Sequence, residues 1–184
     1  MMNYLLSLTI WTPIIFGFIT LVFNKNDCLA RYVALFGSLL ALIFSLILFQ
    51  NFDSHQAAMQ FSEMMPWVAS LNINYHLGVD GISMPFIILN SFITLIVVLA
   101  GWQVIQFKVA QYNAAFLIMS GLFNGIFCAL DGILFYVFFE ASLIPMYLII
   151  GIWGGHNRVY AAIKFFLYTL FGSLLFLVAQ LYLF

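Results

Sequence analysis

Glu140 is the residue whose type and position most clearly indicate chemistry. It lies in an apolar run about eight residues, or roughly 12 Å of helix, from the polar positions on either side. That places it near the centre of a hydrocarbon core about 30 Å thick, where an isolated charge is costly. The acid is expected either to stay protonated or to face a cation or a file of water, so it is predicted to exchange protons. The structural alternative is a neutral glutamic acid that hydrogen-bonds between helices.

Pro145 follows Glu140 in the same run. Proline has no N–H group, so inside a helix it leaves the carbonyl of Ala141 without its usual partner. A free carbonyl at membrane depth needs water or a side chain to bind. The sequence therefore predicts a kink and a small hydrated pocket beside Glu140, to which Tyr136 and Ser142 contribute hydroxyl groups.

Lys164 is the second charged candidate. It lies about one helical turn into the last apolar segment, so its long side chain can reach the cytoplasmic surface by snorkelling. A role in a proton path is the alternative. It is offset from Glu140 by about two helical turns along the membrane normal, and a direct ion pair is not expected.

Signatures of soluble enzymes are absent from the sequence. It has no glycine-rich phosphate loop, no C-x-x-C motif and no H-E-x-x-H motif. The histidines His55, His76 and His156 lie in different loops without ligand spacing, so no metal, haem, nicotinamide or flavin site is predicted. Cys28 and Cys128 are expected near opposite membrane faces and are predicted to be free, because a disulfide needs Cα atoms within about 7 Å.

The composition indicates that lipid surrounds most of this chain. Of its 184 residues, 66% are hydrophobic and only 6% are charged. Soluble domains average about 25% charged residues, so the few charges of this chain cannot cover a surface that faces water. The net charge of −1 and the absence of a basic run give no indication of a nucleic-acid partner.

Six apolar segments are long enough to cross a membrane, which needs about 17–25 residues each. They are residues 4–23, 32–49, 84–106, 114–130, 133–152 and 161–184. The Asp131-Gly132 turn separates the fourth from the fifth, which predicts a tight antiparallel pair. Gly121 and Gly125 form a small-residue pair that favours close helix packing. The predicted fold class is an all-α integral membrane protein with six transmembrane helices.

The basic residues give the orientation through the positive-inside rule. All five fall in or next to the first, third and fifth loops: Lys25, Arg31, Lys108, Arg158 and Lys164. The second loop is the longest and has no basic residue. The odd-numbered loops are therefore predicted to be cytoplasmic and the N-terminus to lie outside.

The chain is divided into three parts on this topology. They are the first two transmembrane helices (1–50), a periplasmic loop (51–83) and transmembrane helices three to six (84–184). The loop is expected to lie along the membrane surface, with Trp67 and Tyr75 at the level of the headgroups. Asp80 is expected to cap the free N–H groups of the next helix.

Four segments together resemble one family of membrane proteins. They are LGVDGIS at 77–83, DGILFYVFFEASLIPMY at 131–147, GIWGG at 151–155 and RVYAAIKFFLYT at 158–169. These runs are similar to the antiporter-like membrane subunits of respiratory complex I, and the resemblance covers the whole chain in order. Subunits of Mrp-type cation/proton antiporters share weaker forms of the same motifs.

The resemblance implies a proton-translocating membrane-arm subunit of a bacterial NADH:quinone oxidoreductase, in the inner membrane. Glu140 matches the family's essential glutamate, which pairs with a lysine in a broken seventh helix. NADH, FMN, iron–sulfur clusters and quinone are expected on partner subunits, and this chain is expected to hold no cofactor. Its expected partners are the other membrane-arm subunits and the lipid bilayer, and it is part of an enzyme only through them.

The family's fold has about fourteen helices in two inverted repeats, of which this chain is expected to hold only the beginning. Two further functions therefore remain open. One is a non-pumping, structural membrane protein of truncated length. The other is a piece of a Mrp-type cation/proton antiporter.

Overall fold

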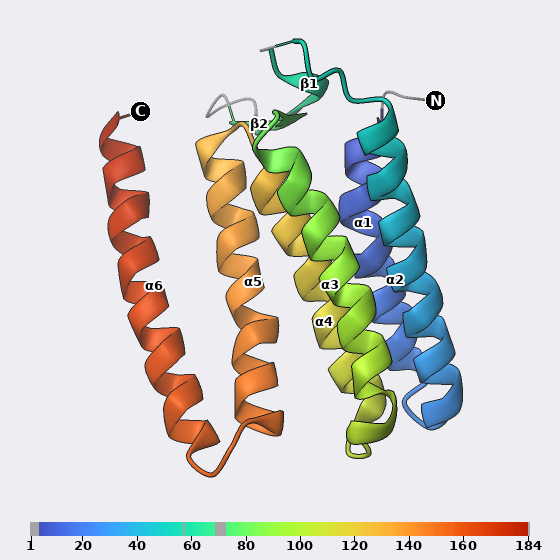
Figure 1. Ribbon diagram of the computed structural model, residues 1–184. Coiled ribbons are helices and arrows are strands. Elements are labelled where there is room, and N and C mark those ends of the chain that lie inside the picture. Colours follow the sequence, from blue (N-terminus) through green and yellow to red (C-terminus); the bar gives the residue numbers. More distant parts are fainter. Residues whose placement is uncertain (1–3, 57, 69–72, 184) are drawn as a thin grey trace.

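The computed structural model describes residues 4–56, 58–68 and 73–183, and within these it has six helices that run side by side (Figure 1). The helices are α1 (Leu5–Val22), α2 (Asp27–Gln50), α3 (Ser83–Val104), α4 (Val109–Cys128), α5 (Gly132–Trp153) and α6 (Arg158–Leu183). Each corresponds to one predicted span, so the helical membrane fold is confirmed. Residues 1–3, 57, 69–72 and 184, some of which fall in the predicted segments, lie outside the described residues.

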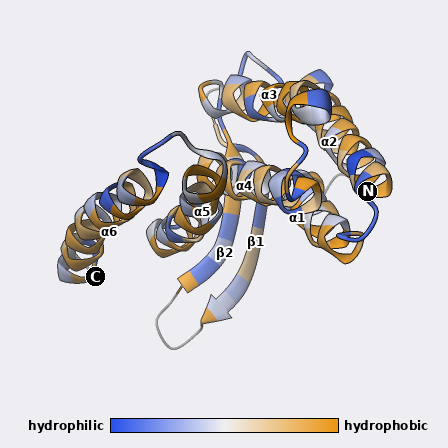
Figure 2. Ribbon diagram, turned by 90° about the horizontal axis from the view of Figure 1, so that it is seen from below, coloured by the Kyte–Doolittle hydropathy of each residue, from blue (hydrophilic) through white to orange (hydrophobic). Residues whose placement is uncertain are grey.

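Five of these helices are long and apolar enough to cross a membrane, and α4 is the exception among the described helices. It carries Gln111, Asn113 and Asn124. It also lies in the middle of the bundle, in contact with α1, α2, α3 and α5. Figure 2 shows the apolar colouring along the helices that surround it. The neighbouring helices, rather than lipid, cover most of α4, which explains why its sequence is less apolar.

The glycine pair of α4 allows close packing on two sides, as predicted. A Cβ atom on Gly121 would lie 2.5 Å from the carbonyl oxygen of Ile10 in α1. A Cβ atom on Gly125 would lie 2.7 Å from the ring of Phe138 in α5. Small residues at such positions let helix backbones approach closely. The pair therefore joins α4 to two different helices.

A buried polar network, which was not predicted, links three helices. The side-chain amide of Asn90 in α3 donates to the Ser120 carbonyl and to Oδ1 of Asn124, both at 2.8 Å. The amide of Asn124 in turn donates to the carbonyl of Thr9 at 3.2 Å. Because Asn124 is fully buried, its polar atoms depend on these partners. The network fixes α3, α4 and α1 relative to one another.

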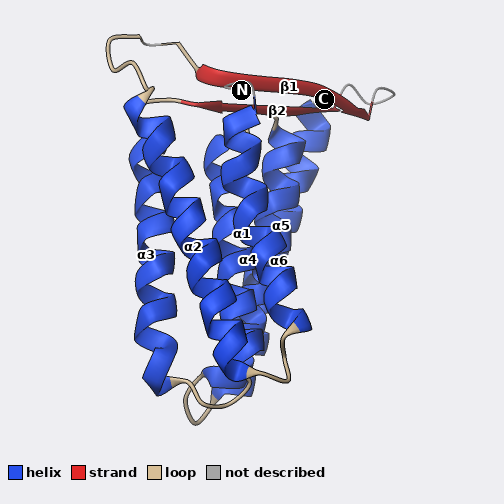
Figure 3. Ribbon diagram, turned by 90° about the vertical axis from the view of Figure 1, so that its right-hand side faces the viewer, coloured by secondary structure: helices blue, strands red, loops and turns tan. Residues whose placement is uncertain are grey.

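A β-hairpin lies across one end of the helices, within the predicted periplasmic loop (Figure 3). Its strands β1 (Gln60–Val68) and β2 (Ile73–Val79) pair antiparallel. The sequence analysis predicted no strand here. Tyr75 turns inward toward α1, whereas Trp67 is exposed. The division of the chain at residues 50 and 83 remains a prediction.

The loops that contain or flank the basic residues lie at the end opposite the hairpin (Figure 1). The helix α1 begins at the hairpin end. The structure thus agrees with the prediction that the first, third and fifth loops lie on one side and the start of the first helix on the other. Cys28 lies in the first turn of α2 and is exposed, whereas Cys128 ends α4 and is buried; both are free. Asp80 caps α3 as predicted, because its Oδ1 accepts from the backbone N–H of Ser83 at 2.7 Å.

Candidate functional site

The half-buried Glu140 lies in the middle of α5, where the hydroxyl of Ser173 donates to its Oε1 atom. Ser173 belongs to α6 and is buried. The same hydroxyl oxygen lies 2.9 Å from the carbonyl oxygen of Leu170, one turn earlier in α6. Glu140 is therefore held between two helices by a polar partner that is itself tied to its own backbone.

Tyr136 is the third member of this cluster. It lies four residues before Glu140, on the same face of α5, and its hydroxyl interacts with the side chains of Glu140 and Ser173. The contribution of the Tyr136 hydroxyl to a hydrated pocket stays a prediction. The predicted contribution of Ser142 is wrong, because its hydroxyl donates to the carbonyl of Phe139 in the same helix at 2.7 Å.

The surroundings of the cluster are aromatic. A cavity of about 550 Å³ lies between α5 and α6. Its walls are Phe135, Phe139, Phe165, Tyr168, Thr169, Gly172, Ser173 and Phe176. The hydroxyls of Ser173, Thr169 and Tyr168 are the polar groups on these walls. This cavity is less polar than the hydrated pocket that the sequence predicts.

Pro145 does not share this cavity, contrary to the expectation that it would open a pocket beside Glu140. It is buried and lines a second cavity of about 580 Å³, between α1, α4 and α5, together with Ala141 and Leu148. Five residues correspond to about 140° around a helix, so Glu140 and Pro145 lie on different faces of α5. The carbonyl that Pro145 frees therefore lies away from the Glu140 cluster.

Lys164 lies far from Glu140 in the structure. It is exposed near the start of α6, and its Nζ atom lies 5.8 Å from the centre of the Tyr160 ring. Nine residues, or roughly 13 Å of helix, separate it from Ser173. This placement favours a side chain that reaches the aqueous boundary, and Lys164 remains a prediction as a proton-path residue.

Ser173 is the residue of this cluster that the sequence analysis missed. It follows Gly172 in an apolar helix, where small residues are common and carry no signal of their own. To find Ser173 from the sequence, one would need to know how α6 is rotated against α5, because that rotation places Ser173 opposite Glu140. Among the described residues, no three of the His, Cys, Asp or Glu side chains come together as a metal site would require.

Comparison with known proteins identifies the relatives of this chain. The family described as NADH:quinone oxidoreductase/Mrp antiporter, TM, matches residues 129–184, which include Glu140 and Ser173. The chain is 44% identical to NADH-quinone oxidoreductase subunit M of Rickettsia prowazekii (strain Madrid E), over 98% of this chain and 38% of that protein. It is 46% identical to NADH-ubiquinone oxidoreductase chain 4 of Arabidopsis thaliana, over 96% of this chain and 36% of that protein.

This chain is a homologue of subunit M. Its fold also matches a chain of respiratory complex I from Thermus thermophilus with bound NADH, with a TM-score of 0.80 and 30% sequence identity. That match covers 96% of this chain and 35% of the solved chain. The subunit M homologue is thus a multi-pass membrane protein with the antiporter-like fold, and it spans a little over a third of the length of the curated relatives.

Proposed function

We propose that this subunit M homologue is part of a proton-translocating membrane-arm subunit of NADH:quinone oxidoreductase, in which Glu140 binds and releases the proton. The observation that carries the proposal is the Glu140–Ser173 contact between α5 and α6, in the middle of an apolar helix pair. A carboxyl group at that depth is stable when it is protonated or when a cation faces it.

The hydrogen bonds available to the cluster suit both protonation states of Glu140. Ser173 has one hydroxyl hydrogen but two acceptors within reach, Glu140 and the carbonyl of Leu170. If Glu140 carries a proton, it can donate to Ser173, and Ser173 can donate to Leu170. If Glu140 is ionised, Ser173 and Tyr136 can both donate to it instead. The cluster thus has partners for both protonation states, as a group that exchanges protons requires.

The names of the relatives, which are subunits of NADH-quinone and NADH-ubiquinone oxidoreductases, support the assignment to such an enzyme. The partners would be other membrane-arm subunits of the oxidoreductase, within the bacterial inner membrane. NADH, FMN, iron–sulfur clusters and quinone would be bound on those partner subunits, so this chain would take part in the enzyme reaction without a redox centre. Lys164 would serve a proton path only as a relay near the cytoplasmic surface.

The test is Glu140→Gln in the assembled oxidoreductase. NADH oxidation by inner-membrane vesicles is measured together with the quenching of a pH-sensitive dye, and assembly is measured by co-purification of the subunits. Proton pumping should be lost while the subunits stay assembled. Ser142→Ala is the matched control, because Ser142 is buried two residues away and bonds only within its own helix.

Two results would favour the other functions. Unchanged pumping in Glu140→Gln would leave a structural, non-pumping role. Sodium-dependent transport without NADH oxidation would indicate a Mrp-type antiporter instead.

A further inference from the structure

Glu63 is a buried carboxyl group outside the proposed proton site. It lies on β1 of the hairpin and is only 5% exposed. Its Oε1 atom accepts from the backbone N–H of Leu6 at 2.9 Å, and both of its oxygens lie 3.3 Å from the backbone nitrogen of Ser7. Ser7 also donates its hydroxyl hydrogen to Oε2. The carboxylate therefore satisfies free N–H groups in the first turn of α1, where the helix dipole favours negative charge.

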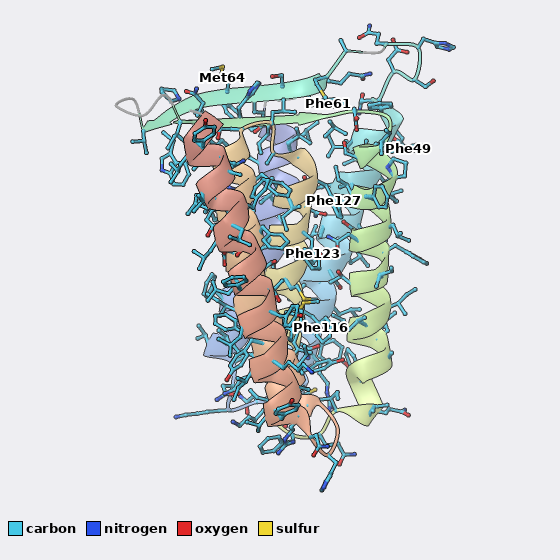
Figure 4. The ribbon with its side chains drawn as sticks, turned by 90° about the vertical axis from the view of Figure 1, so that its left-hand side faces the viewer. Phe49, Phe61, Met64, Phe116, Phe123 and Phe127 are labelled. Atoms are coloured by element: carbon cyan, nitrogen blue, oxygen red, sulfur yellow. The ribbon has the colours of Figure 1, made fainter. Side chains whose placement is uncertain are left out.

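A bulge in β1 directs Glu63 toward α1. The pairing of the strands shifts between Gln60 and Glu63. Phe61 within this bulge has a φ of 53°, which is rare for a bulky residue. Bulges re-aim side chains, and strained residues persist where the surrounding contacts fix them. Figure 4 shows Phe61 and Met64 on the hairpin above the helices. The strained backbone is thus associated with the inward placement of Glu63.

A chain of hydrogen bonds ends at Glu63. The indole N–H of Trp11 donates to the Tyr75 hydroxyl, and that hydroxyl lies 3.2 Å from the Ser7 hydroxyl. Because the hydrogen of Ser7 is used on Glu63, Tyr75 must donate to Ser7. Burial raises the pKa of Tyr75, and the nearby charge of Glu63 raises it further. Tyr75 therefore keeps the hydrogen that this arrangement needs.

The second strand joins the other side of the hairpin to the turn before α5. The N–H of Leu130 donates to the carbonyl of His76 at 2.9 Å. The N–H of Asn74 donates to Oδ2 of Asp131 at 3.1 Å. Oδ1 of Asp131 caps α5, because it accepts from the N–H groups of Ile133 and Leu134. The hairpin is therefore bonded to the outer ends of both α1 and α5.

We propose that Glu63 is a positioning residue that locks the hairpin onto α1 and, through β2 and Asp131, fixes the outer end of α5. The carboxylate holds β1, the strand pairing carries that constraint to β2, and β2 holds the cap of α5. The coupling is a property of the fold and does not depend on the proposed proton function.

Hydrogen–deuterium exchange of the purified protein in lipid nanodiscs tests this coupling. Glu63→Ala removes the carboxylate, and Met64→Ala is the control on the same strand, because Met64 is 63% exposed. In Glu63→Ala, peptides that cover the first turn of α1 and peptides that cover residues 130–134 should both exchange at least about tenfold faster, as expected when a bond to a charged group is lost. Met64→Ala should change neither.

Faster exchange at α1 alone would overturn the proposal, because Glu63 would then be only a local helix cap. Unchanged exchange at both sites would overturn it as well. If Glu63→Ala fails to fold, Ser7→Ala is the second variant, because it removes one hydrogen-bond donor to Glu63 and keeps the carboxylate. It should give a smaller increase at the same two sites, and an increase confined to α1 would again contradict the coupling.

Discussion

The hydroxyl of Ser173 in α6 donates to the carboxyl group of Glu140 in α5, and this pair joins two helices in the apolar middle of the protein. The α5–α6 contact also includes two aromatic pairs, Phe135 with Phe176 and Tyr147 with Phe166. Because a hydrogen bond to an ionised carboxylate is stronger than one between neutral groups, the strength of the Ser173–Glu140 contact depends on the protonation state of Glu140.

Ser173→Ala should slow proton pumping without abolishing it. The substitution removes one hydrogen bond to Glu140, and a typical bond of this kind contributes about 0.5–1.5 kcal/mol, which corresponds to about a two- to tenfold change. The initial rate of dye quenching in vesicles measures the effect. A rate equal to that of the wild type, at equal assembly, would remove Ser173 from the proposed site.

Tyr136→Phe should be coupled to Ser173→Ala. Both hydroxyls interact with the same carboxyl group, so their effects should not be additive. Pumping rates of the two single variants and the double variant form a cycle. A double variant whose loss equals the product of the single losses would show that the two hydroxyls act independently.

Alanine substitutions in the glycine pair should destabilise the bundle in a defined order. Gly121→Ala should cost most, about 1–3 kcal/mol, because the new Cβ would meet the backbone carbonyl of Ile10. Gly125→Ala meets a side chain, the Phe138 ring, that can shift, and should cost less. Gly155→Ala has nothing within 4 Å and is the control. Thermal unfolding in detergent measures the order, and equal melting temperatures would contradict the packing described for α4.

Asn124→Ala should destabilise the contact between α3, α4 and α1. The change leaves the carbonyl of Thr9 without its donor and the amide of Asn90 without one acceptor. Hydrogen bonds between membrane helices contribute about 0.6 kcal/mol on average and up to about 1.7 kcal/mol, and this site loses two. Urea or SDS titration of the purified protein measures the loss. Ser91→Ala is a suitable control, because that hydroxyl bonds only to the Ile87 carbonyl of its own helix.

The Asp80 cap of α3 should depend on pH. Backbone N–H donation from Ser83 is the main cause that lowers the pKa of Asp80 below its ordinary value of 3.8. A folded-state pKa below the unfolded value means that the cap contributes fully above about pH 4 and is lost as the pH falls through the folded value. As the pH falls through this range, the protection of the first-turn amides of α3 against hydrogen exchange should therefore decrease. Protection here is the exchange rate relative to that of an unfolded peptide at the same pH. Asp80→Asn should remove that pH dependence.

Sequence reasoning located Glu140 and the helices because both follow from local properties. A charge in an apolar run and the length of that run can be read without knowledge of any neighbour. Ser173 and Glu63 could not be found in this way. Ser173 matters because α6 places it opposite Glu140, and Glu63 matters because a strained bulge turns it toward α1.

The hairpin and the Pro145 cavity were missed for a related reason. Pro66 lies within β1, and a proline inside an apparent strand argues against that assignment unless the strand lies at an edge or a bulge. The position of Pro145 relative to Glu140 depends on the angle between two faces of α5. Glu140 and Pro145 are only five residues apart in the sequence, which suggests that they are neighbours. In a helix, however, that spacing turns the two side chains toward different faces.

The central place of α4 has a consequence for how the protein is made. A helix with a polar side that bonds to its neighbours inserts poorly into lipid alone, because the asparagine amides would then have no partner. Its short turn to the more apolar α5 lets the two enter the membrane as a pair. We expect α4 to become stably integrated only after α1 and α3 are in place, so synthesis from the N-terminus provides the partners in the required order.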